Sequence, residues 1–411
     1  MKFTKLGALT ATAVLAISAC TPTGAPGASG GGEKGTIDIW SSLPRQGSSK
    51  AQTDTMVFAI KMAIEERGGK VAGYTINYVD KDDATAAAGK WDEQTEIKNA
   101  NDAVANDKLV AYLGTLNSGA AKLSIPILCT KGIVMVSAAN TAVGLTKKFD
   151  EGEPEKYYPN DCKKNYHRVI PNDLLQGKAG ALWTSQLGAK KVYIVDDGEV
   201  YGKGLADVYA NEAPGNGLEI LGRDGIDGKA SDYKALAHKI KAAGPDLVYY
   251  GGITQNNAGQ LWRDLRDAMP DVKLMGPDGI FESEFLEAAT EAAEGTYITT
   301  TAVPPDQLTG KGAEFVKKYT AKHPNNPVEG YTAYAYESAN VLLAAIERAA
   351  AKNPADILAL RALVLDEVKA TKDFDGILGK WTFDADGDTS LVDVSGLIIT
   401  GDKFKFDKVI R

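Results

Sequence analysis

Residues 109–121 read LVAYLGTLNSGAA, an apolar run that ends in glycine and continues into small polar residues. The apolar part has the length and composition of a buried strand, and the residues after Ser118 begin a helix. Residues 132–141, GIVMVSAANT, repeat this order of strand and polar turn. Strands that alternate with helices form parallel sheets joined by right-handed crossovers. Both stretches therefore predict an α/β fold.

The same alternation continues over the rest of the chain. Strands are predicted over Thr36–Trp40, Tyr74–Asp80, Leu109–Leu113, Ile133–Ser137, Lys191–Asp196, Asp246–Tyr250, Val272–Met275 and Tyr297–Thr301. Helices are predicted over Ser48–Arg67, Thr85–Asn106, Asp173–Leu187, Ser231–Ala243, Asn257–Ala268, Gly312–Lys322 and Gly330–Ala351. A single open sheet rarely holds a chain of 411 residues. We therefore expect two Rossmann-like lobes with parallel sheets flanked by helices, and a ligand cleft at the carboxyl ends of the strands.

The N-terminal residues have the pattern of a targeting segment. Lys2 and Lys5 precede a short apolar stretch that ends Ile17-Ser18-Ala19-Cys20 and resembles a bacterial lipobox. The resemblance implies a signal peptide over residues 1–19 and a lipid on Cys20; the alternative is an ordinary signal peptide with a cysteine there by chance. Residues 20–35 are rich in Gly, Pro, Ser and Thr and predict a flexible tether. We expect an extracytoplasmic protein held at a bacterial membrane.

Two further cysteines, Cys129 and Cys162, remain in the body of the chain. A disulfide is permitted outside the cytoplasm and would fasten an inserted loop, predicted over Tyr157–Tyr166, to the body. Two separate thiols are the alternative, with Cys129 buried after an apolar stretch.

Composition and missing motifs narrow the function. The formal charge of −8 argues against a general nucleic-acid binder, and three His with three Cys argue against a zinc site. No phosphate loop, nucleophile elbow or metalloprotease motif appears in the sequence. Asp384–Asp388 looks like a calcium loop but has glycine at the wrong position, so a turn is predicted. We expect a binding protein and no enzyme, with no metal and no cofactor.

Polar side chains follow four of the predicted strands. Ser118 and Thr141 stand at strand-to-helix turns, where hydroxyls and free N–H groups bind an anion, or where they only cap the helix. Tyr201 precedes a glycine-flanked helix start and can cover an apolar ligand, or only pack at the surface. Asp278, in Gly276-Pro277-Asp278-Gly279, can pair with an ammonium group or stabilise the turn. Together they suit a zwitterion bound between two lobes.

The sequence resembles the branched-chain amino-acid-binding proteins of ABC importers, which have the type I periplasmic-binding fold. The matching stretches are GIVMVSAANT (132–141), VYIVDDGEVYGKGLADV (192–208), SDYKALAHKIKAAGPDLVYYGG (231–252), LMGPDGI (274–280), AAEGTYIT (292–299) and FDGILGKWTFDADGD (374–388). They occur in the order of the family.

The resemblance implies roles for individual residues. Ser118 and Thr141 would hold the α-carboxylate of an amino acid, and Asp278 with the carbonyl of Ala139 would hold its α-ammonium. Tyr201 matches the tyrosine of the family's cleft. Asn140 and Gly279 stand beside these residues in the same turns, and we include both in the predicted site.

Three positions depart from the family. Asp278 replaces the usual Glu, and Ile253 stands where an aromatic residue is frequent. In the family, an aromatic residue of lobe one covers the side-chain pocket. The corresponding position here falls near Ser48 or Ser49, with Arg45 close by. These departures predict a pocket that is more polar than in the family. With Arg45 in this pocket, the ligand could be polar or acidic.

The fold that the resemblance implies has three strand connections between its lobes, near Ile170–Pro171, Thr301–Pro304 and Thr382–Asp386. Lobe one would span residues 36–171 with 303–383, and lobe two 172–302 with 384–411. Ligand would close the lobes by hinge bending, and the closed form would meet an ABC permease and its ATPase subunits. A sensor for a signalling receptor, and a short amide, urea or small carboxylate as ligand, are the alternatives. The family implies a monomer.

Overall fold

The computed structural model describes residues 33–411. The predicted signal peptide, the predicted lipid site at Cys20 and most of the predicted tether lie outside these residues. Within them, no helix has both the length and the apolarity needed to span a membrane.

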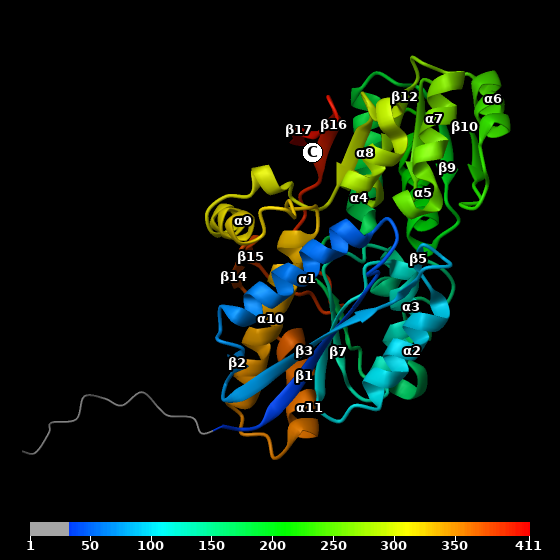
Figure 1. The fold of residues 1–411 in the computed structure, drawn as a ribbon. Coiled ribbons are helices and arrows are strands. Elements are labelled where there is room, and N and C mark those ends of the chain that lie inside the picture. Colours follow the sequence, from blue (N-terminus) through cyan, green and yellow to red (C-terminus); the bar gives the residue numbers. More distant parts are fainter. Residues whose placement is uncertain (1–32) are drawn as a thin grey trace, which may run out of the picture. The chain divides into compact units, whose positions relative to one another are not determined.

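The first sheet forms lobe one (Figure 1). Its strands, in spatial order, are β2 (Lys70–Val71), β3 (Tyr74–Asp82), β1 (Thr36–Leu43), β6 (Leu109–Gly114), β7 (Val134–Ser137) and β8 (Tyr166–Arg168). All neighbours pair in parallel except β2, which pairs with β3 in antiparallel fashion. Side chains alternate between the two faces of each strand, so Val134 and Val136 enter one core while Ile133 and Met135 enter the other.

Helices cover both faces of this sheet. One face packs against α1 (Lys50–Glu65), α10 (Thr332–Ala350) and α11 (Ile357–Lys369). The other face packs against α2 (Glu93–Val104) and α3 (Ser118–Cys129). Because α10 and α11 come from the end of the chain, the core of lobe one joins segments that are far apart in the sequence.

The second sheet forms lobe two. Its order is β10 (Glu219–Gly225), β9 (Lys191–Asp196), β11 (Leu247–Gly251), β12 (Lys273–Gly276), β13 (Tyr297–Thr300), β16 (Ser395–Ile399) and β17 (Phe404–Val409). The first five strands are parallel and the last two are antiparallel. Its flanking helices are α4 (Asp173–Gln186), α5 (Val200–Glu212), α6 (Lys234–Ala243), α7 (Ala258–Ala268) and α8 (Ser283–Ala289). The helix α9 (Lys311–Lys322) follows the second connection, and its Phe315 and Tyr319 pack into the core of lobe one.

The chain passes between the sheets three times, after β8, after β13 and after the short hairpin of β14 (Phe374–Gly376) and β15 (Gly379–Trp381). The third connection carries a turn in which the Asp384 carboxylate accepts from the N–H groups of Asp386 and Asp388, both at 2.9 Å. Asp388 also forms a buried ion pair with Arg168 of β8, at 2.6 Å. This contact fixes the third connection beside the first.

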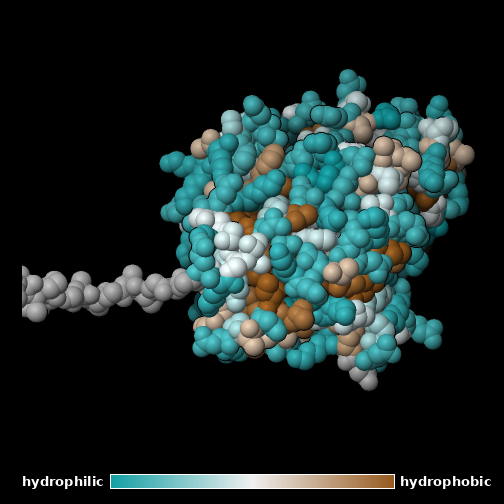
Figure 2. Space-filling model, turned by 60° about the horizontal axis from the view of Figure 1, so that its bottom comes forward, coloured by the Kyte–Doolittle hydropathy of each residue, from teal (hydrophilic) through white to brown (hydrophobic). Residues whose placement is uncertain are grey.

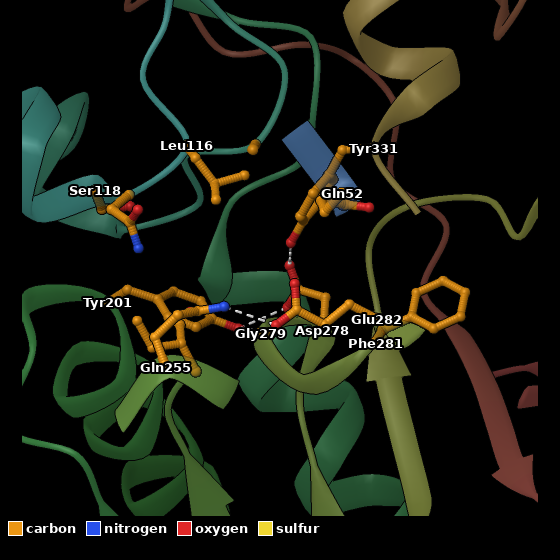
Figure 3. A pocket seen from close by; sticks show the side chains of 13 residues that line it. Gln52, Leu116, Ser118, Tyr201, Gln255, Asp278, Gly279, Phe281, Glu282 and Tyr331 are labelled. Carbon is orange, nitrogen blue, oxygen red and sulfur yellow. Dashed lines mark hydrogen bonds between the residues drawn. The ribbon is translucent and has the colours of Figure 1, made fainter. Parts of the chain in front are cut away.

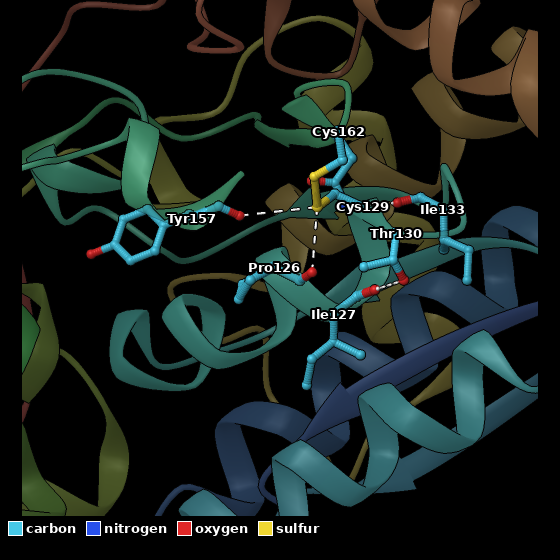
Figure 4. Close-up of a disulfide and its surroundings, with 8 residues drawn as sticks. Pro126, Ile127, Cys129, Thr130, Ile133, Tyr157 and Cys162 are labelled. Carbon is cyan, nitrogen blue, oxygen red and sulfur yellow. Dashed lines mark hydrogen bonds between the residues drawn. A yellow bond between two sulfur atoms is a disulfide. The ribbon is translucent and has the colours of Figure 1, made fainter. Parts of the chain in front are cut away.

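A disulfide joins Cys129, the last residue of α3, to Cys162, with Cα atoms 5.8 Å apart (Figure 4). Two single-turn 3-10 helices, Glu155–Tyr157 and Pro159–Asp161, precede Cys162. The structure thus pairs the two cysteines, and the loop between β7 and β8 is fastened to α3.

Every strand predicted from the sequence is present, with ends that differ by few residues. One helix prediction is too long. Residues 85–106 were expected to be one helix, but β4 (Ala84–Thr85) and β5 (Lys90–Trp91) form a hairpin and α2 begins only at Glu93. The Asp92 carboxylate caps α2 by accepting from the Thr95 N–H at 2.9 Å, which fixes the start of the helix.

Most apolar side chains are buried in the two lobes. On the face shown in Figure 2, hydrophilic residues predominate and apolar residues occur in small groups. Among the described residues, the exposed large apolar side chains are Leu174, Leu358, Val392 and Val409.

Candidate functional site

A pocket lies at the carboxyl ends of the strands and is lined by both lobes (Figure 3). Lobe one contributes Gln52, Leu116, Asn117, Ser118, Ala139 and Tyr331. Lobe two contributes Tyr201, Ile253, Gln255, Asp278, Gly279, Phe281 and Glu282. The free space, counted with its opening to solvent, is about 460 Å³. Six of the nine predicted ligand-binding residues therefore line one pocket.

Ser118 supplies a hydrogen-bond donor at one end of the pocket. It is the first residue of α3, so the N–H groups of the first turn have no partner within the helix and carry its positive dipole end. The Ser118 hydroxyl accepts from the Ala142 N–H at 3.3 Å, which leaves its own hydrogen for another acceptor. This end of the pocket can therefore bind a carboxylate.

Asp278 is the central acid of lobe two, and it is almost completely buried. Its Oδ1 accepts from the Tyr201 hydroxyl at 2.7 Å, and its Oδ2 accepts from the Tyr331 hydroxyl (Figure 3). Its Oδ1 also accepts from Gln176 Nε2 at 2.5 Å. Burial raises the pKa of Asp278, and the three hydrogen bonds oppose that rise. An ionised carboxylate offers about four acceptor positions, so one remains for a ligand ammonium group.

Gly279 lets the Asp278 turn approach the neighbouring loop closely. A Cβ atom on Gly279 would lie 2.3 Å from the Gly252 carbonyl oxygen and 2.8 Å from a ring carbon of Tyr201. Ile253, which follows Gly252, lines the same wall and is nearly buried. Glycine is thus required for Tyr201, Ile253 and Asp278 to meet at the pocket.

Side chains of the two lobes also meet around the pocket. Tyr331 of lobe one donates to Asp278 of lobe two. At the edge, Lys90 of lobe one contacts Glu199 Oε1 at 2.6 Å and Asn256 Oδ1 at 2.7 Å on lobe two. The two lobes are therefore closed over the pocket in this structure.

Comparison with known families decides the classification. Residues 36–392 match the family described as periplasmic binding protein. The chain belongs to this family. The match confirms the resemblance and the type I periplasmic-binding fold expected from the sequence. Proteins of this family bind solutes and act outside the cytoplasm.

Known periplasmic binding proteins are similar over most of their length. The Leu/Ile/Val-binding protein BraC3 of Rhizobium johnstonii is 28% identical over 86% of this chain and 88% of its own. The leucine-binding protein LivK of Thermotoga maritima is 25% identical, with a TM-score of 0.79 over 92% of this chain and 99% of its own. LivJ of Streptococcus pneumoniae, solved with isoleucine, is 25% identical, with a TM-score of 0.77 over 91% of this chain and 99% of its own.

In this periplasmic binding protein, Arg45 does not line the pocket, contrary to our expectation. Its guanidinium group pairs with Asp54 at 2.7 Å and with Asp80 at 3.1 Å, and it donates to Thr53 at 2.9 Å. Asp80 belongs to β3, which pairs with β1 just before Arg45, so the topology brings this acid to the arginine. Arg45 holds the loop before α1, and Gln52 of α1 faces the pocket in its place.

Asn140 and Thr141 also lie outside the pocket lining. The Asn140 amide donates to the carbonyl oxygens of Thr115 at 2.9 Å and Leu116 at 2.8 Å, so it holds the loop that carries Ser118. The Thr141 hydroxyl is buried without a partner among the described residues, and the Thr141 carbonyl accepts from the Asp173 N–H at 2.9 Å. Thr141 therefore lies beside the start of α4, at the first connection between the lobes.

Eight residues at the site were absent from the sequence-based prediction. Seven line the pocket and the eighth, Gln176, donates to Asp278; they are Gln52, Leu116, Asn117, Gln255, Phe281, Glu282, Tyr331 and Gln176. Gln176 lies on α4 one turn after Asp173, and Tyr331 directly precedes α10. No motif marks these positions. Gln176 and Tyr331 reach Asp278 from elements that follow a crossing between the lobes, whereas Glu282 lies four residues after Asp278 in the same segment of lobe two. Asp173 lies behind Asp278, and burial together with the charge of Asp278 raises its pKa.

Proposed function

We propose that this chain is an extracytoplasmic solute-binding lipoprotein that captures an amino acid and delivers it to an ABC permease with its ATPase subunits. The observation that carries the proposal is the pairing of Ser118 with Asp278 in one pocket, each on a different lobe. Ser118 and the start of α3 suit a carboxylate, and Asp278 suits an ammonium group. The relatives named above, which bind leucine, isoleucine or valine by their names, support an amino acid as the ligand.

The binding step follows from this arrangement. The ligand carboxylate first meets the Ser118 hydroxyl and the N–H groups of α3 in lobe one. Lobe two then closes, and the Asp278 carboxylate accepts a hydrogen bond from the ligand ammonium. Closure excludes water, so both charge-assisted hydrogen bonds strengthen in the lower dielectric. The ligand stabilises the closed form only by binding it more tightly than the open form.

The remaining parts of the proposal concern the whole protein. A lipid on Cys20 would hold the protein at the membrane, and residues 20–35 would give the lobes reach toward the permease. We propose a monomer without catalytic activity, with lobe one over residues 36–171 and 303–383 and lobe two over 172–302 and 384–411. The hinge is proposed at the three connections.

Thermal shift and calorimetry with matched ligands test the proposal. Each L-amino acid is compared with the acid that lacks its amino group and with the amine that lacks its carboxylate, for example leucine, 4-methylpentanoate and 3-methylbutylamine. We expect saturable stabilisation by at least one amino acid and at least a hundredfold weaker binding of both analogues. Equal binding of the acid analogue would assign the pocket to carboxylates instead of amino acids. Failure of every amino acid to bind would refute the proposed function.

A further inference from the structure

The end of the pocket opposite Ser118 is rich in hydrogen-bond acceptors. In the view of Figure 3, Ser118 lies at one side of the pocket, and Gln52, Tyr331 and Glu282 lie toward the other. Glu282 follows the Asp278 turn and is only 6% exposed. Its Oε1 accepts from Gln255 Nε2 at 2.7 Å. A carboxylate has about four acceptor positions, so Glu282 retains capacity toward the cavity.

Gln52 is a second polar group at this end, and its amide oxygen has no protein partner in the part of the chain that the structure describes. Its side chain lines the pocket and is 1% exposed. Its Oε1 is buried and has no hydrogen-bond partner among the described residues. A buried amide oxygen without a partner is costly, and a ligand that donates to it removes this cost.

The acidic residues at this end of the pocket also favour a ligand group that donates hydrogen bonds. Asp278 and Glu282 line the pocket, whereas no lysine, arginine or histidine is among the described lining residues. Glu284 and Glu329 stand near Glu282, and burial together with their charges raises its pKa well above the usual range. Arg45, which does not line the pocket, is paired with Asp54 and Asp80. A cationic group at this end would favour the ionised form of Glu282, and an N–H group would meet its acceptor oxygens, so either complements this end and an acidic ligand side chain is disfavoured.

We infer that the ligand is an amino acid whose side chain carries nitrogen-borne hydrogen-bond donors, and that Glu282 and Gln52 select it. This inference rests on the proposed function, since it assumes that Ser118 and Asp278 hold the α-carboxylate and the α-ammonium. The donor can be an ammonium or guanidinium group, as in lysine, ornithine or arginine, or a neutral amide, as in glutamine. Leu116, Ile253 and Phe281 line the same pocket and would pack against the aliphatic part of such a side chain.

Calorimetry with the full chain separates the possibilities. Lysine, ornithine, arginine and glutamine are compared with norleucine and leucine, which have similar aliphatic size without a donor. We expect at least one donor-bearing amino acid to bind at least tenfold more tightly than norleucine. Tighter binding of glutamine identifies a neutral amide as the donor, and tighter binding of the basic amino acids identifies a cation.

Two variants test the residues. Glu282→Gln should weaken the preferred ligand at least tenfold while norleucine changes by less than threefold, and Gln52→Leu should weaken the preferred ligand about fivefold. Glu287→Gln removes a charge from the exposed face of α8, the helix that directly follows Glu282, and should change neither affinity. Thermal unfolding of each variant shows whether it is folded.

The result that overturns the inference is leucine or norleucine bound at least as tightly as every donor-bearing amino acid. That result would leave the proposed amino-acid binding intact. Binding of no amino acid at all would refute the proposed function and this inference together.

Discussion

The two walls of the pocket differ in whether their buried polar groups have hydrogen-bond partners within the protein. The lobe-two acid, Asp278, is held within its own lobe by Tyr201 and Gln176, so its position is fixed before a ligand arrives, and Tyr331 of lobe one adds a third hydrogen bond in the closed form. The lobe-one wall holds polar groups without partners, because the side-chain oxygens of Gln52 and Asn117 are buried and unbonded among the described residues. Lobe two thus presents a preorganised charge, and lobe one presents groups whose hydrogen bonds the ligand must complete.

Loss of the preorganised charge should have the largest effect. Asp278→Ala leaves the ligand ammonium buried without a counter-charge, and we expect amino-acid binding to weaken by about 3–5 kcal/mol. Calorimetry measures the change. Asp271→Ala, which removes an exposed aspartate from the same lobe, is the control and should bind normally. An unchanged affinity in Asp278→Ala would remove Asp278 from the site.

Removing the disulfide tests whether the stability of lobe one can be lowered without a change in ligand affinity. Its cysteines are 33 residues apart, and replacing both by alanine should lower the free energy of unfolding by about 2–4 kcal/mol. Affinity should stay within a factor of two, because neither cysteine lines the pocket. Denaturant unfolding and calorimetry on the same variant check both statements. A large loss of affinity would show that the fastened loop shapes the lobe-one wall.

Ser118 tests the carboxylate end of lobe one. Ser118→Ala removes one hydroxyl donor while the N–H groups of α3 remain, so we expect a loss of about 1.5–3 kcal/mol in binding. The helix start should survive, because the Ser118 side chain does not cap α3. If Ser118→Ala costs more than Asp278→Ala, lobe one carries the dominant charge recognition and the comparison above is reversed.

The raised pKa of Asp278 predicts a direction for the pH dependence of binding. The ligand ammonium requires the ionised carboxylate, so binding lowers a pKa that burial raises in the free protein. Affinity should therefore be constant above the free-protein pKa and should fall up to about tenfold per pH unit below it. Calorimetry from neutral to acidic pH measures this slope. The same slope in Asp278→Asn would assign the titration to another group.

Lys90 should have the smallest effect, since it lies at the edge of the lobe contact. Its ion pair with Glu199 is partly exposed, so Lys90→Met should weaken binding by about 0.2–1 kcal/mol. The effect should shrink further in high salt. A loss comparable to that of Ser118→Ala would mean that edge contacts, more than the pocket, hold the lobes closed.

Local patterns in the sequence predicted most of the fold and one half of the site. Ser118, Tyr201 and Asp278 follow apolar strands directly, and the carboxyl ends of parallel strands converge, so their meeting could be foreseen. Arg45 shows the limit of this reasoning. Its position in the sequence suggested that Arg45 lines the pocket. In the structure, strand β3 places Asp80 next to Arg45, which forms an ion pair with it instead. Tyr331 could not be found locally, because it reaches Asp278 only after the second crossing of the chain.

The discontinuous core of lobe one has a consequence for how the protein is made. The parallel strands of lobe two, from β9 to β13, are complete once residue 300 has been synthesised. The first sheet must wait for α10 and α11, whose Val341, Leu342 and Leu360 cover its apolar face. Lobe two in turn must wait for β16 and β17, since Leu397 and Ile399 of β16 enter its core. Neither lobe therefore reaches its native packing until segments near the end of the chain have been made, and the strands made first stay incompletely covered until then.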